Sequence, residues 1–98
     1  MKTDIRDGIT FFDGGKVTEK AFILIKCETG EVNKVIDEVK KIENIQEAYA
    51  ITGTHDIITF VETVNLPTLQ DVIIEKLRKV DAVTGTSTAM VVSEWKRN

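Results

Sequence analysis

The stretch Thr52-Gly53-Thr54-His55-Asp56 is the part of this chain whose residue types could do chemistry. A glycine turn can present two or three backbone amides beside the carboxylate of Asp56, so the amides would hold a ligand carboxylate and Asp56 its ammonium group. Glycine and aspartate are also the usual residues of a tight hairpin, in which Asp56 would only bond its own backbone. His55 fits an exposed loop position as well as a ligand contact. The pattern alone leaves a zwitterion site and an ordinary turn both open.

Few other residues are suited to catalysis or to metal binding. The sequence has one histidine and one cysteine, Cys27, and no paired carboxylates, Cys-His arrangement or dinucleotide fingerprint. A metal site needs three or four ligands, whereas the adjacent His55 and Asp56 would point to opposite faces of a strand. Cys27 ends an apolar run and is expected to be a small buried hydrophobic residue. We therefore expect no catalytic residue, no metal site, no cofactor and no enzymatic activity.

Composition limits the class of protein. The 98 residues, 42% hydrophobic and 30% charged, suit one globular domain. Thirteen Lys and Arg against sixteen Asp and Glu give a net charge of −3, the wrong sign for binding nucleic-acid phosphates directly. The sequence shows no apolar stretch of signal-peptide or membrane-spanning length, and its single cysteine excludes an intramolecular disulfide. A cytoplasmic location without a membrane partner fits these features best.

Hydrophobic periodicity predicts the elements that must position the loop. Short runs rich in β-branched and aromatic residues predict strands over residues 21–27, 45–52, 57–64 and 84–92. A first helix is predicted from the spacing of Val32, Val35, Ile36 and Val39. A second is predicted to start at the cap Asn65 with Pro67 in its first turn. Its apolar positions are Leu66, Leu69, Ile73, Leu77 and Val80. Alternation in the last strand puts Thr84, Thr86, Thr88 and Met90 on one side.

This order of elements predicts an α+β fold, the ferredoxin-like βαββαβ arrangement with an antiparallel sheet and two helices on one face. The strands over 22–25 and 57–58 are apolar at consecutive positions, which is typical of strands covered on both faces. Two helices cover only one face, so we expect a second copy to cover the other in a homodimer. In the alternative, the N-terminal extension, residues 1–19, folds back with Phe11 and Phe12 over that face. The extension is expected to be a hairpin or a flexible segment.

Two segments of the chain form a recognisable pair, Ile51-Thr52-Gly53-Thr54-His55-Asp56-Ile57 and Val80-Asp81-Ala82-Val83-Thr84-Gly85-Thr86-Ser87-Thr88. Together they resemble the effector domain of the Lrp/AsnC family of regulators. The resemblance covers about residues 20–95 and identifies residues 20–98 as this ligand-binding domain, also called the RAM domain. It implies subunits that dimerise through their sheets as a dimeric α/β barrel, further assembly into tetramers or octamers, and amino-acid effectors bound between dimers.

Carried over by position, the resemblance implies an effector site lined by the loop and two hydroxyls. The loop residues are Thr52, Gly53, Thr54, His55 and Asp56, and the hydroxyls are those of Thr86 and Thr88. Glu47 or Tyr49 would approach from the neighbouring strand. The family's helix-turn-helix, about fifty residues, does not fit into the first twenty, so the chain resembles a stand-alone form that acts through a protein partner such as a DNA-binding paralogue. His55 stands where the family more often has tyrosine, which leaves the effector and its pH response open.

Two other functions fit such a fold. Small ferredoxin-like dimers include monooxygenase-like and haem-binding enzymes, whose chemistry lies in a cavity between helices and sheet. A purely structural module that joins a DNA-binding paralogue in mixed oligomers would need no ligand. The sequence favours amino-acid sensing over both.

Overall fold

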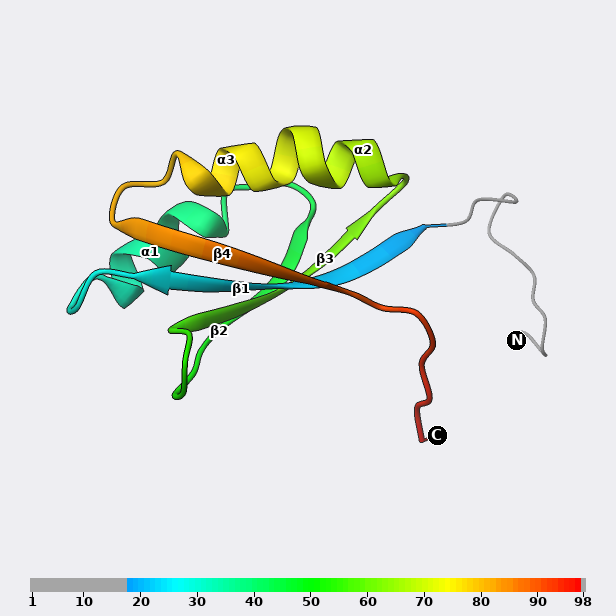
Figure 1. The fold of residues 1–98 in the computed structure, drawn as a ribbon, viewed down its shortest axis with the longest axis horizontal. Helices are drawn as coiled ribbons and strands as arrows, with labels where there is room; N and C mark the ends of the chain where they lie inside the picture. The colour runs from blue at the N-terminus through cyan, green and yellow to red at the C-terminus, as the bar shows by residue number, and fades with distance from the viewer. Residues whose placement is uncertain (1–17, 98) are drawn as a thin grey trace.

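The structure, a computed structural model, describes residues 18–97 and contains four strands and two helical segments in the order βαββαβ (Figure 1). The strands are β1 (Glu19–Cys27), β2 (Ile45–Ala50), β3 (Ile57–Thr63) and β4 (Val83–Met90). The first helix is α1 (Val32–Val39), and the second consists of α2 (Leu66–Thr68), the π-helical η1 (Leu69–Ile74) and α3 (Glu75–Arg78) in direct succession. The predicted α+β fold is confirmed. A hairpin within residues 1–17 lies outside the described residues.

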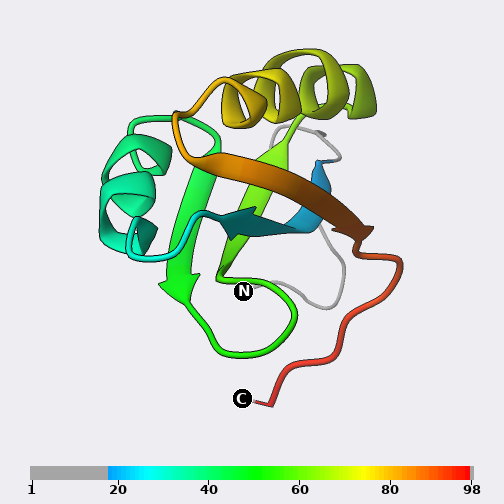
Figure 2. The same ribbon diagram turned by 60° about the vertical axis from the view of Figure 1, so that its left-hand side comes forward.

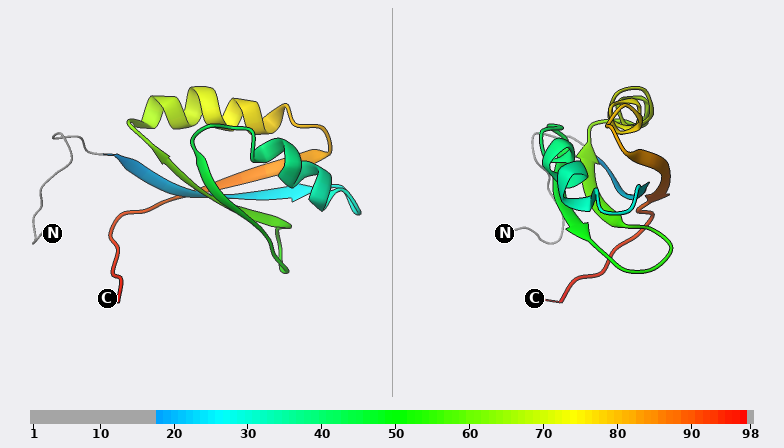
Figure 3. Two further views of the ribbon diagram at one scale, coloured as in Figure 1. Left: turned by 180° about the vertical axis from the view of Figure 1, so that it is seen from behind. Right: turned by 90° about the vertical axis from the view of Figure 1, so that its left-hand side faces the viewer.

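The strands form one antiparallel sheet in the order β2-β3-β1-β4. The helices lie together on one face of this sheet, and within residues 18–97 the other face carries no helix (Figures 1 and 3). None of the helices within residues 18–97 is long and apolar enough to cross a membrane. The central strand β1 pairs with both β3 and β4 up to Ile25, and beyond it with β4 alone.

The core fills the space between the helices and the covered face of the sheet. The sheet contributes buried side chains at alternate positions, namely Ala21, Ile23, Ile25, Ile57, Thr59 and Val61. The helices contribute Val35, Val39, Leu69, Ile73 and Leu77. Each large apolar side chain contributes roughly 1.5–3 kcal/mol when fully buried. Thr59 is tolerated among them because its hydroxyl donates to the carbonyl of Ile23 at 3.0 Å.

The second helix starts as the sequence predicts. The Asn65 side chain accepts from the backbone N–H of Thr68 at 2.8 Å, and Pro67 occupies the first turn. Leu69, Ile73 and Leu77 follow at four-residue intervals along the buried face. Continued backwards, that interval reaches residue 65, and Leu66 is 42% exposed. Leu66 therefore lies off the buried face that Leu69, Ile73 and Leu77 form.

A bulge in β2 changes which side chains share a face. Ile45 pairs with Val61, but Glu47 pairs with the preceding residue Phe60, so Gln46 is an extra residue in the strand. Ile45 therefore lies on the helix side with Val61, whereas Glu47 lies on the opposite side. The strand therefore does not alternate strictly along its length, because an inserted residue reverses which face every following side chain occupies.

A second irregularity lies where β1 meets the start of β4. Lys26 pairs with Gly85 and Cys27 with Val83, which leaves Thr84 without a partner on β1. Thr84 therefore does not continue the row that Thr86 and Thr88 form, and the four-member row expected from alternation is shortened at this end.

The face of the sheet away from the helices, here called the open face, has an apolar centre. It carries Phe22 and Leu24 of β1 opposite Phe60 and Ile58 of β3. The rings of Phe22 and Phe60 lie 5.3 Å apart between centroids, and Phe22 is 40% exposed. The consecutive apolar residues of β1 thus serve two faces, and the helices of one chain cover only one of them.

Candidate functional site

The loop over residues 51–56 joins β2 to β3 and projects beyond the sheet on the side away from the second helix (Figure 2). Its ends are joined by a hydrogen bond of 2.9 Å from the N–H of Ile51 to the carbonyl of Asp56. Gly53 has a φ of +122°, which side chains with a Cβ rarely adopt. No atom lies within 4 Å of the position that a Cβ would take, so backbone conformation and not space requires the glycine. The expectation that glycine makes this turn is confirmed.

The tip of the loop leaves its backbone donors open. Within residues 18–97, the backbone N–H groups of Thr52, Gly53, Thr54 and His55 have no hydrogen-bond acceptor. The first three of these residues are exposed. Neighbouring backbone amides in a turn can together bind one anion, such as a carboxylate, because their N–H groups form a concave set of donors. The loop can therefore receive an anionic group.

Asp56 attaches the loop to β1 through both backbone and side chain. Its N–H donates to the carbonyl of Ile25 at 2.9 Å, and its Oδ2 accepts from the N–H of Cys27 at 2.9 Å. The second bond satisfies an amide at the irregular end of β1, where the register shifts. From the sequence, the Asp56 carboxylate was expected either to bond the backbone of its own turn or to hold the ammonium group of a ligand. The structure adds a partner 29 residues away, and the half-buried carboxylate retains a second oxygen.

Lys26 is a residue of this region that the sequence did not single out. Its Nζ donates to the carbonyl of Thr54 at 2.8 Å, which places an ammonium group beside the loop tip. Within the described part of the chain, no carboxylate oxygen lies within 4.0 Å of Nζ. An ammonium has three donors, so two are available to another acceptor. The signal in the sequence was a lysine that interrupts the apolar run of β1 one residue before the strand ends.

His55 is half-buried, and its Nδ1 lies 3.1 Å from the hydroxyl of Thr54. This contact holds the ring against its own loop. Which of the two atoms donates depends on the tautomer of the imidazole.

Thr86 and Thr88 lie near the loop in the fold but on the other side of β1. They pair with Ile25 and Ile23, whose side chains are in the core, so both threonines lie toward the helix side of the sheet. Asp56 and Thr86 thus flank the same residue, Ile25, from two neighbouring strands. The structure brings the five loop residues together, and the participation of the two threonines in the same site stays a prediction.

Glu47 and Tyr49 lie on the open face of β2, opposite Phe60 and Ile58. Hydrogen bonding to the Glu47 carboxylate and then the charge of that carboxylate raise the pKa of the Tyr49 phenol. The Tyr49 side chain is 54% exposed. Both side chains are placed to meet a molecule that approaches the open face.

Cys27 lies beside the carboxylate of Asp56, and its thiol is not activated. Partial burial raises the pKa of the thiol, and the negative charges of Asp56, Glu31 and Glu28 raise it further. A nucleophilic cysteine needs the opposite environment, one that stabilises the thiolate. Between residues 18 and 97, no three His, Cys, Asp or Glu side chains are grouped so that they could hold a metal ion.

Comparison with known proteins gives one family. Residues 20–98 match the family described as the Lrp/AsnC ligand binding domain. An uncharacterised HTH-type transcriptional regulator of Pyrococcus abyssi is 34% identical over 76 residues, which are 78% of this chain and 48% of the relative. The chain thus spans about half the length of the curated relatives it matches.

Solved structures agree with this match. A hypothetical protein from Pyrococcus horikoshii is 34% identical, with a TM-score of 0.69 over 78% of this chain and 92% of that one. A transcriptional regulator from Neisseria meningitidis, solved as a complex with L-Met, is 16% identical. It has a TM-score of 0.75 over 94% of this chain and 62% of its own, so this second likeness is one of fold alone.

Proposed function

This chain belongs to the Lrp/AsnC ligand-binding domain family. We propose that it binds a free amino acid at the loop over residues 52–56, and that this binding changes the activity of a transcriptional regulator with which the chain associates. The observation that carries the proposal is the arrangement at the loop tip. Four open backbone amides, the carboxylate of Asp56 and the ammonium group of Lys26 lie around one short turn. The role is binding without reaction, and the ligand leaves unchanged.

The charges of the loop complement those of an amino acid. The α-carboxylate would accept from the loop amides and from the free donors of Lys26, and the α-ammonium would donate to the open oxygen of Asp56. Both interactions involve an ionised group, which makes them stronger than neutral hydrogen bonds. A neutral or singly charged ligand would satisfy only half of this arrangement. The L-Met complex of the Neisseria regulator supports an amino acid as the class of ligand.

The route to transcription is part of the proposal. The curated relatives are HTH-type regulators, and this chain corresponds to about half of their length. The chain would act on transcription as the sensing part of an assembly in which a DNA-binding protein of the same family takes part. Its net charge of −3 also argues for such a partner and against direct contact with DNA.

Oligomerisation would complete the unit. The open face exposes aromatic and aliphatic side chains around Phe22, and a second copy is the simplest cover for such a face in a small domain. A stable contact would need about 800 Å² from each partner. Contacts between such dimers would then place Thr86 and Thr88 or their symmetry mates near ligand, as the family resemblance implies.

A melting experiment tests the sensing proposal. Each of the common amino acids is added at millimolar concentration, and unfolding is followed by circular dichroism at fixed protein concentration. A ligand present at about a hundred times its dissociation constant stabilises the native state by roughly 2.7 kcal/mol, which raises the Tm by about 10 °C or more in a domain of this size. Equilibrium dialysis should return that ligand unchanged.

Paired variants locate the site. Asp56→Asn keeps an oxygen that can accept from the Cys27 N–H but loses the charge that would hold an ammonium group, so its response to the ligand should vanish. Asp71→Asn, an exposed carboxylate on η1, is the matched control and should respond like the parent. If no amino acid raises the Tm, sensing is refuted. If Asp56→Asn responds fully, the site lies elsewhere.

A further inference from the structure

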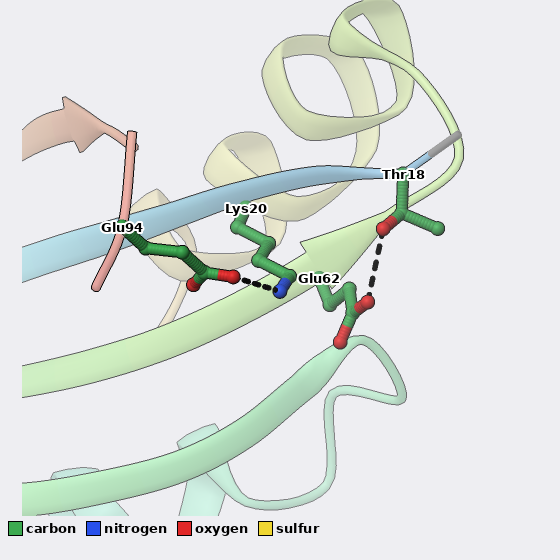
Figure 4. A network of polar contacts seen from close by, with 4 residues as sticks. All are labelled: Thr18, Lys20, Glu62 and Glu94. Carbon is green, nitrogen blue, oxygen red and sulfur yellow. Dashed lines mark hydrogen bonds and ion pairs between the residues drawn. The ribbon is translucent and has the colours of Figure 1, made fainter. Parts of the chain in front are cut away.

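The segment after β4 is attached to the sheet at two points. The N–H of Val91 donates to the carbonyl of Lys20 at 2.9 Å, and the carboxylate of Glu94 accepts from Nζ of Lys20 at 3.0 Å (Figure 4). The hydrogen bond from Lys20 and then its charge lower the pKa of Glu94, which favours the carboxylate that accepts this bond. Residues 91–97, here called the C-terminal arm, leave the sheet and run away from the helices (Figures 1 and 3).

The arm presents the only tryptophan of the chain to solvent. Trp95 follows directly after the anchor Glu94 and is 74% exposed. The guanidinium carbon of Arg97 lies 4.8 Å from the centre of its ring, a cation–π contact that fixes one face of the indole. Tryptophan is among the residues that contribute most to protein interfaces, because it buries a large area and loses few rotamers. Such a residue exposed on an anchored segment points to a partner.

Beside Trp95 lies a groove that its ring does not fill. The groove encloses about 610 Å³ between the arm and the open face. Its sheet wall includes Phe22, Phe60 and Glu47, and its other wall is the arm with Trp95 and Lys96. The groove is therefore aromatic at its base, with the Glu47 carboxylate on its sheet wall and the charged groups of Glu94 and Lys96 on the wall formed by the arm. It has room for a side chain as large as an indole.

We propose that this groove receives the C-terminal arm of a second copy of this chain, so that Trp95 of each copy packs on Phe22 and Phe60 of the other. A two-fold axis makes such an exchange reciprocal, because each chain carries both the projecting ring and the groove. Glu47 has no cation within 4.0 Å among the described residues, and the arm that enters the groove brings Lys96 and Arg97. The Glu47 carboxylate is thus complementary in charge to the arm that enters the groove, whereas Glu94 is already paired with Lys20.

The exchange goes beyond the dimer of the proposed function, on which it rests. Burial of two indoles adds about 300–500 Å² of apolar contact, a sizeable part of what a stable interface needs. The groove continues directly into the open face through Phe22 and Phe60. The arm therefore extends the contact between sheets and fixes the relative rotation of the two copies.

Fluorescence of the single tryptophan tests the exchange. The parent is diluted from about 100 µM to well below the dissociation constant while its mass is followed by sedimentation. The emission maximum should move to longer wavelength in step with the loss of dimer, because Trp95 becomes exposed. A constant emission maximum across a measured dimer–monomer transition would overturn the exchange and leave the sheet contact and the sensing proposal standing.

Variants give the second readout. Trp95→Ala removes one anchor from each copy. If each lost anchor weakens the dimer about tenfold, the dissociation constant of the dimer should rise about 100-fold. Glu47→Lys places a like charge opposite Lys96 and Arg97 and should also weaken the dimer. Val72→Ala, which changes an exposed apolar residue on the helix side, is the control and should not weaken the dimer.

The variants also distinguish other occupants of the groove. Trp95 and Glu47 are exposed, so far-ultraviolet circular dichroism should show the parent fold in both variants. Dimerisation of Trp95→Ala at parental affinity would refute the exchange. A parent protein that stays monomeric at 100 µM would also refute the exchange. If dimers appear only after residues 1–17 are deleted, that segment is the occupant of the groove.

Discussion

Replacing Asp56 by alanine should destabilise the chain, apart from any effect on ligand. The carboxylate accepts from the N–H of Cys27 at 2.9 Å, and alanine leaves this half-buried amide without that acceptor. A hydrogen bond to a charged group contributes about 1.5–3 kcal/mol to stability. Asp56 is half-buried, and solvent reduces the value, so we expect a loss of about 1–2 kcal/mol. In a domain of this size that lowers the Tm by about 5–10 °C.

Asp56→Asn isolates the hydrogen bond from the charge. The asparagine side chain retains an oxygen acceptor in nearly the same place, so this variant should lose less than half as much stability as the alanine variant. Urea denaturation followed at 222 nm gives both differences from the midpoint and the slope. Protein concentration must be equal in all samples, because association would otherwise alter the apparent stability.

Two results would refute this reasoning. If the alanine variant unfolds at the midpoint of the parent, the bond to Cys27 does not stabilise the loop. If the asparagine variant loses as much as the alanine variant, the charge of Asp56 and not its accepting oxygen stabilises the native state. The first result would leave Asp56 entirely available to ligand.

The second helix and the cysteine give two further tests. Asn65→Ala removes the cap of α2 and should cost about 1 kcal/mol in urea denaturation, whereas Asn65→Asp should cost much less because it retains the acceptor; equal losses in the two variants would exclude the cap. The raised pKa of the Cys27 thiol means less thiolate at pH 8, and so slower alkylation by iodoacetamide than a free cysteine shows. Removing the negative charge in Asp56→Asn should lower that pKa and speed alkylation at pH 8, and an unchanged rate profile would contradict the electrostatic cause.

Much of the fold follows from features that extend over a few residues. The spacing of Val32, Val35 and Val39 predicted α1, and Asn65 with Pro67 predicted the start of the second helix. Each of these patterns acts within one or two helical turns, so one sequence is enough to interpret it. The bulge at Gln46 could not be found in this way, because it exists only in the pairing of β2 with β3.

The candidate site likewise combines features that are local in the sequence with contacts between distant residues. Gly53 and the amides beside it belong to one turn, and the turn is visible in the sequence. The ammonium group of Lys26 reaches the loop from 28 residues away, and the N–H of Cys27 reaches Asp56 from 29. Both contacts depend on β3 lying beside β1, which the order of the strands decides.

By itself the sequence determined which segments form strands and helices, where the chain turns, and that β1 has apolar side chains on two faces, because backbone preference and periodicity are properties of neighbouring residues. Only the tertiary structure decided which distant groups surround the loop, that Thr86 and Thr88 lie on the helix side, and that Trp95 is held beside an aromatic groove. These depend on strand order, register and bulges, in which a shift of one residue moves a side chain to the other face of the sheet.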